Sequence, residues 1–98
     1  MYEIADINIT AEKETDFEAA VNEASAQFRV AKGCRSLELQ RSIENPTHYR
    51  LVVGWDSVDD HRVTFRESEG FQIWRSLVSA YFSEPPKVEH VSSVFKGF

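Results

Sequence analysis

The segments RSLELQRSI (35–43), ENPT (44–47) and HYRLVVGW (48–55) decide the fold of this chain. The first and third alternate between apolar and polar residues, as a β-strand with one buried face does. The proline of the middle segment has no amide proton to donate to a strand ladder, so it belongs in a turn. We therefore predict a β-hairpin, followed by a helix that begins at Ser57 and carries His61.

The residues before the hairpin predict a strand and a helix. Residues 2–10 alternate, and one face of this strand is apolar: Ala5, Ile7 and Ile9. Thr15 and Glu18 have the spacing of a capping box, in which each side chain binds a free backbone amide at a helix start. Apolar residues then recur at helical spacing up to about Ala31, namely Phe17, Ala20, Val21, Ala24 and Phe28. Gly33 suits the left-handed conformation that ends many helices.

The residues after the hairpin predict a helix in two parts and a last strand. Ser57 and Asp60 cap the first part, whose inner side we expect to be Val58, His61 and Phe65. Ser68 caps the second, which has an apolar stripe: Phe71, Trp74, Leu77, Val78 and Tyr81. Two prolines end it, and residues 87–95 alternate again. The order predicts one ferredoxin-like α+β domain over residues 1–98, with a βαββαβ antiparallel sheet and its helices on one face.

Composition narrows the function classes. The chain has 98 residues, a formal net charge of −5 and no run of lysine or arginine, which disfavours nucleic-acid binding. Acidic residues on the exposed sheet face argue against a surface for single-stranded RNA as well. No apolar run approaches the roughly 20 residues that span a bilayer, so we expect no membrane partner. Cys34 alone offers neither an internal disulfide nor a metal-ligand spacing, and without a secretory signal we expect a cytoplasmic protein.

The predicted sheet has a second face that no helix covers. Alternation places on it a mixture of apolar and hydrogen-bonding side chains: Ile4, Val52, Val91 and Phe95 beside Asp6, Asn8, Glu38, Gln40, Arg50 and Glu89. Such a mixture is typical of an interface between proteins. We therefore expect two copies of the chain to pack face to face as a homodimer.

Several stretches, spread over nearly the whole chain, together carry a resemblance: Gly33-Cys34, LELQRSIENP (37–46), YRLVVGWDS (49–57) with His61, FRES (65–68) with Phe71 and Trp74-Arg75, and PKVEH (86–90). They resemble the antibiotic biosynthesis monooxygenase domain. The resemblance implies a dimeric α/β barrel. It also implies an activity within a family that contains cofactor-free monooxygenases, haem-degrading enzymes and members without an assigned role.

Two groups within that family imply different site residues. The anthrone-oxidising members use an asparagine, a tryptophan, a tyrosine and an arginine; Trp55 and Arg75 match two of these, whereas Leu51 and His61 replace the others. The haem-degrading members use an asparagine, a tryptophan and an iron-binding histidine. Those three positions fall here on Ala5, Phe65 and Arg75. Without the histidine this mode of haem binding loses its anchor, so we rank haem binding last and expect no cofactor and no metal.

The resemblance makes a cofactor-free monooxygenase of an anthrone or quinol the first hypothesis. His61 is the candidate base, Arg75 the partner of the developing anion and Trp55 a ring that stacks on a planar substrate. The candidate walls of the pocket for a small aromatic or hydrophobic ligand are Tyr49, Leu51, Phe65 and Trp74. The nearby carboxylates of Asp56, Asp59 and Asp60 favour the charged form of His61.

Each of these residues also has a plainer interpretation. Trp55 and Trp74 could fill the core, His61 could be an exposed residue at a helix start, and Arg75 could lie on the surface. His90, on the last strand, is expected to be structural or part of an interface. The second hypothesis is therefore a non-catalytic dimer that binds a small hydrophobic ligand, and the leucine at position 51 favours it.

Overall fold

The computed structural model describes all of residues 1–98, and its elements follow the order expected from the sequence. They are β1 (Tyr2–Asn8), α1 (Glu14–Arg29), β2 (Cys34–Arg41), β3 (His48–Trp55), the π-helix η1 (Asp60–Phe65), α2 (Glu69–Val78), the 3₁₀-helix η2 (Ser79–Tyr81) and β4 (Lys87–Val91). The four strands form one antiparallel sheet in the order β2-β3-β1-β4. The ferredoxin-like α+β fold is thereby confirmed.

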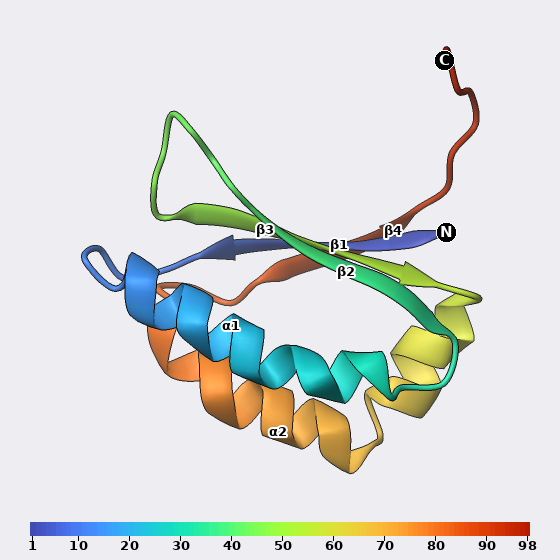
Figure 1. Ribbon diagram of the computed structural model, residues 1–98, viewed down its shortest axis with the longest axis horizontal. Helices are drawn as coiled ribbons and strands as arrows, with labels where there is room; N and C mark the ends of the chain where they lie inside the picture. The colour runs from blue at the N-terminus through green and yellow to red at the C-terminus, as the bar shows by residue number, and fades with distance from the viewer.

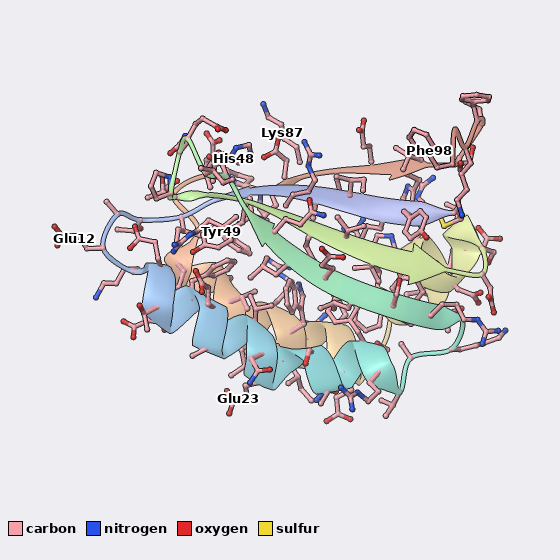
Figure 2. The ribbon with its side chains drawn as sticks, turned by 45° about the horizontal axis from the view of Figure 1, so that its top comes forward. Glu12, Glu23, His48, Tyr49, Lys87 and Phe98 are labelled. Atoms are coloured by element: carbon pink, nitrogen blue, oxygen red, sulfur yellow. The ribbon has the colours of Figure 1, made fainter.

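The molecule has two layers, a sheet and a pair of helices on one of its faces. Figure 1 shows α1 and α2 side by side beneath the sheet, with η1 at the end where β3 leads into it. The other face has no helix, and in Figure 2 the side chains of His48 and Lys87 project from it while Tyr49 lies between β3 and the helices. On that open face His48 is hydrogen-bonded to Asp6. None of the helices is both long and apolar enough to cross a membrane.

The strand register determines which residues reach the helices. Ala5 of β1 lies opposite Leu51 of β3 and Val88 of β4, and two residues earlier Glu3 lies opposite His90. Since side chains on one face repeat every second residue, the apolar faces of β1 and β3 meet α1 and α2 in one core. The buried apolar residues are Ala5, Ile7, Ile9, Phe17, Val21, Ala24, Phe28, Tyr49, Leu51, Val53, Trp55, Phe65, Trp74 and Val78. Outside this apolar set, Glu3 and His61 are the two buried residues, and both have strongly polar side chains.

Two of the expected helix caps are present. The Ser57 hydroxyl accepts a hydrogen bond from the Asp60 amide (3.1 Å) and the Ser68 hydroxyl one from the Phe71 amide (3.2 Å). Gly33 has the expected left-handed conformation, with φ +78°, and a β-carbon there would clash with the Asp60 carboxylate. It follows the end of α1 at Arg29 by several residues, so its role is to turn the chain into β2.

Three details differ from the sequence prediction. The helix α1 begins at Glu14 after Lys13, so Thr15 is already inside it and the predicted capping box is wrong. Glu18 instead binds partners on β2 and β3. The strand β4 ends at Val91, and the residues after it form a tail without regular structure that leads to Phe98 (Figure 2). Phe95 therefore lies on this tail, 86% exposed, and not on the open face of the sheet.

Candidate functional site

A pocket of about 640 Å³ lies between the helix-facing side of the sheet and the helix α2. Strands β1, β3 and β4 form one side of it, and α2 with the segment that leads to β4 forms the other. Its lining residues are Glu3, Ala5, Ile7, Leu51, His61, Arg66, Phe71, Trp74, Arg75, Ser79, Phe82, Ser83, Glu84, Pro85, Pro86 and Val88. The pocket is therefore mainly apolar, with charged side chains at defined positions.

The buried end of the pocket holds a carboxyl group and an imidazole. Oε1 of Glu3 accepts a hydrogen bond from the indole Nε1 of Trp55 (3.0 Å) and lies 3.3 Å from Nε2 of His61. The Trp55 and His61 rings are stacked, with 5.4 Å between their centroids and 27° between their planes. The side chains of Glu3 and His61 are only 7% and 6% exposed. The stacking and the shared carboxyl group together hold the imidazole in a defined orientation.

The same imidazole is connected to the edge of the sheet. Nδ1 of His61 lies 2.8 Å from Nε2 of His90, which is on the edge strand β4 and is partly exposed. The ring centroids of the two histidines are 5.1 Å apart. Glu3, His61 and His90 thus form a continuous chain of close polar contacts between the pocket and the edge of the sheet.

Burial shifts the acid–base properties of both pocket groups toward their neutral forms. It raises the pKa of Glu3 to about 7, against the lowering effects of the Trp55 hydrogen bond and of the nearby Arg66 charge. It lowers the pKa of His61 to about 4, and repulsion from His90, Arg66 and Arg62 adds to this. At neutral pH the carboxyl group is close to half ionised and the imidazole is uncharged.

The expectation that His61 is charged is therefore wrong. The ring lies against Trp55 in the core, whereas two of the three acidic residues expected to stabilise its charge have other partners. Asp56 is bound by Arg35 at 2.7 Å, and Asp60 lies 3.9 Å from Lys32. The alternative interpretation of His61 as an exposed residue at a helix start is also excluded, since the residue is 5% exposed.

The exposed rim of the pocket carries two guanidinium groups. Those of Arg66 and Arg75 lie 5.7 Å and 6.0 Å from the centroid of the Phe71 ring. Neither arginine belongs to an ion pair within the chain. Two guanidinium groups without a salt-bridge partner at the opening of this pocket favour a ligand that is anionic or becomes so.

The structure brings together four of the seven residues that the sequence suggested for the site. Leu51, His61, Trp74 and Arg75 line the pocket. Trp55 and Phe65 lie behind this lining and contact each other, with their ring centroids 5.5 Å apart. Both shape the pocket through the residues they support.

Tyr49 does not line this pocket. It lies six residues before Trp55, at the other end of β3, where it is buried and its hydroxyl group donates to Glu18 at 2.6 Å. Sharing a face of the strand with Trp55 therefore does not bring it to the same site, because the pocket occupies only one end of that face.

Three residues of the site were missed or undervalued in the sequence: Glu3, Arg66 and His90. The signal for Glu3 was present, since extending the alternation of Ile9, Ile7 and Ala5 by two residues places a carboxyl group on a buried apolar face. The register of β4, which places His90 opposite Glu3, could not be obtained from the sequence.

Comparison with known proteins identifies the family. The family model for antibiotic biosynthesis monooxygenases matches residues 1–77. The chain belongs to the antibiotic biosynthesis monooxygenase family. The match includes Glu3, His61, Arg66 and Arg75 and ends before His90.

Individual proteins are similar to this chain over nearly its whole length. A crystal structure from Bordetella bronchiseptica that carries the same family name is 49% identical, covers 96% of both chains and superposes with a TM-score of 0.94. The uncharacterized protein YczJ of Bacillus subtilis is 32% identical over 92 residues, which are 94% of this chain and 97% of YczJ. A structure from Nitrosomonas europaea with the same family name is 19% identical, and the match covers 96% of this chain and 89% of the Nitrosomonas chain. Its TM-score of 0.83 shows that the two proteins share a fold.

Proposed function

We propose that this protein is a cofactor-independent monooxygenase that oxidises an electron-rich aromatic compound of the anthrone or quinol type. The observation that carries this proposal is the combination of groups in one pocket: an apolar floor, a buried carboxyl–imidazole pair and two unpaired guanidinium groups. Such a compound needs only to lose a proton to become reactive toward dioxygen, and these groups favour that step.

Each group has a distinct role in the proposed reaction. The methylene group of an anthrone and one O₂ give a carbonyl and one water, so no further reductant is needed. The proton leaves to the Glu3–His61 pair, and Arg75, together with Arg66, stabilises the anion that forms. Leu51 and Trp74 contact the aromatic rings of the substrate, and this apolar lining keeps water from the reactive anion.

Oxygen uptake with a panel of anthrones and quinols tests the proposal. We expect consumption well above the uncatalysed rate for at least one compound, and in Arg75→Ala a loss of about tenfold in kcat/KM, since a partly exposed charge contributes less than a buried one. Arg29→Ala is the matched control, because Arg29 is an exposed arginine on α1 outside the pocket. A panel without any catalysed uptake would contradict the proposal.

A second candidate function is binding of a hydrophobic ligand without turnover. The observation in its favour is Leu51, which offers the pocket floor only an apolar surface where the anthrone-oxidising members of the family have a hydrogen-bonding asparagine. Thermal stabilisation by a panel compound that is recovered unchanged after incubation in air would favour this candidate over the first.

We also propose that the chain works as a homodimer through the open face of the sheet. This face carries apolar side chains, among them Ile4 and Val52, between charged ones such as Arg50 and Glu89. Sedimentation should give the mass of a dimer, and Val52→Asp should give a monomer. Val63→Asp, on η1 and away from this face, is the control that stays dimeric, and a monomeric wild type at all concentrations would contradict the proposal.

A further inference from the structure

We propose that Glu3 is the group that takes the substrate proton. We also propose that His61 and His90 form a path along which the protonated carboxyl group of Glu3 loses its proton to solvent at the edge of the sheet. This inference deepens the proposed function and depends on it for its substrate. It assigns roles to Glu3 and His90 and makes His61 a positioning and proton-conducting residue.

The geometry gives the two oxygens of Glu3 different tasks. Oε1 is occupied by Trp55 at 3.0 Å and His61 at 3.3 Å, whereas Oε2 has no partner within the chain. No buried side-chain nitrogen or oxygen of the chain lacks a hydrogen-bond partner. Oε2 is therefore accessible, and since Glu3 lines the pocket, this oxygen is the one that a ligand can reach.

Protons can pass along these contacts in either direction. When Glu3 is protonated, its O–H donates to Nε2 of His61, and Nδ1–H of His61 donates to Nε2 of His90. Loss of a proton from Nδ1 of His90 to solvent then lets each inner proton move one step outward. Glu3 becomes a carboxylate, both rings end with the proton on Nε2, and neither ring has to remain charged.

This path matters because the substrate fills the pocket. An apolar ligand over Glu3 keeps water away from Oε2, so a carboxyl group that was protonated on binding could not lose its proton through the pocket. The path through His61 and His90 leaves by the edge strand β4 instead. The resulting carboxylate takes the first C–H proton of the substrate on Oε2, and the carbanion adds O₂ to form a peroxide anion. Glu3 returns this proton to the peroxide and then removes the second C–H proton as the O–O bond breaks. The carbonyl forms, the leaving hydroxide takes that second proton to become water, and Glu3 is again a carboxylate.

The charges around the chain are consistent with this behaviour. Arg66 acts on Glu3, Arg66 and Arg62 act on His61, Arg62 acts on His90, and the thiol of Cys34 is close enough to Glu3 to respond to its charge. With the pKa of Glu3 at about 7 and those of both histidines lowered by burial, the carboxyl group titrates near neutrality while the rings stay uncharged. The three side chains are not arranged as ligands around a metal ion.

The test is the tautomeric state of the two rings, measured by nitrogen NMR on ¹⁵N-labelled protein from pH 6 to pH 9. We expect the proton of both rings to move from Nδ1 to Nε2 with one shared midpoint near pH 7. The wild type alone can overturn the proposal, because a purely structural network keeps each ring in one tautomer across this range.

Variants assign the shared transition to its source. Glu3→Gln removes the titrating group and should abolish the transition at both rings, whereas Glu23→Gln should leave it unchanged. Glu23 is an exposed residue on the outer side of α1 (Figure 2), so the control has the same chemistry without contact to the site. A transition that persists in Glu3→Gln would also overturn the proposal.

Turnover separates this inference from the proposed function. With an active compound, we expect Glu3→Gln to lose about 100-fold or more in kcat, and His90→Ala to lose turnover that added imidazole restores. If Glu3→Gln turns over substrate at the wild-type rate, the role assigned to Glu3 is wrong, whereas the proposed monooxygenase activity is unaffected. If the two rings change tautomer together but no compound gives catalysed oxygen uptake, the proton path is supported and the proposed monooxygenase activity is contradicted.

Discussion

Strand β3 carries two aromatic residues that each donate a hydrogen bond to a glutamate, one near each end of the strand. Near the N-terminal end, the Tyr49 hydroxyl donates to Glu18 of α1 (2.6 Å). At the C-terminal end, the Trp55 indole donates to Glu3 of β1 (3.0 Å). Both aromatic side chains lie on the helix-facing side of the sheet and are almost fully buried.

The two glutamates differ in exposure and in their charged neighbours. The Glu18 side chain is 45% exposed and forms an ion pair with Arg41 at 3.0 Å. The Glu3 side chain is 7% exposed, and its second partner is the neutral imidazole of His61. Burial without an ion-pair partner is what brings the pKa of Glu3 to about 7. The same hydrogen-bond pattern thus connects α1 to β3 at one end and holds a buried carboxyl group with a raised pKa at the other.

The two ends of the strand also differ in the acid–base properties of their buried groups. Burial, with a contribution from the hydrogen bond to Glu18, raises the pKa of the Tyr49 hydroxyl group to about 12. The group therefore stays protonated over the whole range in which Glu3 titrates. Tyr49 supports the fold at its end of the strand.

The largest effect on stability is expected from Trp55→Ala. This change removes a fully buried indole, leaves a cavity beside Phe28 and Phe65 and deprives Glu3 of its hydrogen-bond donor. Large-to-small changes of this kind cost about 3–5 kcal/mol. Urea unfolding measures it, and a cost below about 1 kcal/mol would mean that the indole is not part of the packed core.

The next effect concerns how stability depends on pH. Burial raises the pKa of Glu3 from 4.5 to about 7. The contribution of Glu3 to the free energy of unfolding is therefore complete below pH 4.5 and is lost as the pH rises through 7. Burial lowers the pKa of His61 from 6.5 to about 4. The contribution of His61 to the free energy of unfolding is therefore complete above pH 6.5 and is lost as the pH falls through 4. Between pH 4.5 and 6.5 the two effects oppose each other.

Variants that remove one group should therefore reveal the other. In Glu3→Gln the free energy of unfolding should rise with pH between 4 and 6.5, and in His61→Phe it should fall between 4.5 and 7, each by up to about 3 kcal/mol. Urea unfolding at a series of pH values measures both slopes. Two variants with slopes of the same sign would contradict the account.

The smallest effects belong to the other end of β3. Tyr49→Phe leaves the ring in place and should cost about 1 kcal/mol, the value of one hydrogen bond. Glu18→Gln removes a partly exposed ion pair and should cost less than about 1 kcal/mol. Neither variant should alter the pH dependence near neutrality, and a change in it would show that the two ends of the strand are not independent.

Much of the fold could be predicted because it depends on local patterns. The alternation of β1 identified its buried face, and Ser57 and Ser68 were recognised as helix caps from their spacing. The start of α1 was not recognised, because Glu18 fits a capping pattern but is used to bind Tyr49 and Arg41. The end of β4 was missed because alternation continues beyond Val91, where no neighbouring strand is paired with it.

The candidate site was only partly predictable, because its properties depend on contacts between distant elements. The sequence shows three aspartates near His61, but not that Arg35 and Lys32 engage two of them or that the ring is enclosed in the core. The contact between His61 and His90 requires the register of β4 on β1. Glu3 stood out only as a charged residue in an apolar alternation, a signal that gives its burial but not its partners.

The most direct test of the account is the titration of the Glu3 side-chain carboxyl carbon, followed by NMR in ¹³C-labelled protein and assigned with Glu3→Gln. We predict a midpoint near pH 7 in wild type. A midpoint close to the ordinary 4.5 would show that the carboxyl group is already ionised well below neutrality, and the acid–base role assigned to the pocket would then be wrong.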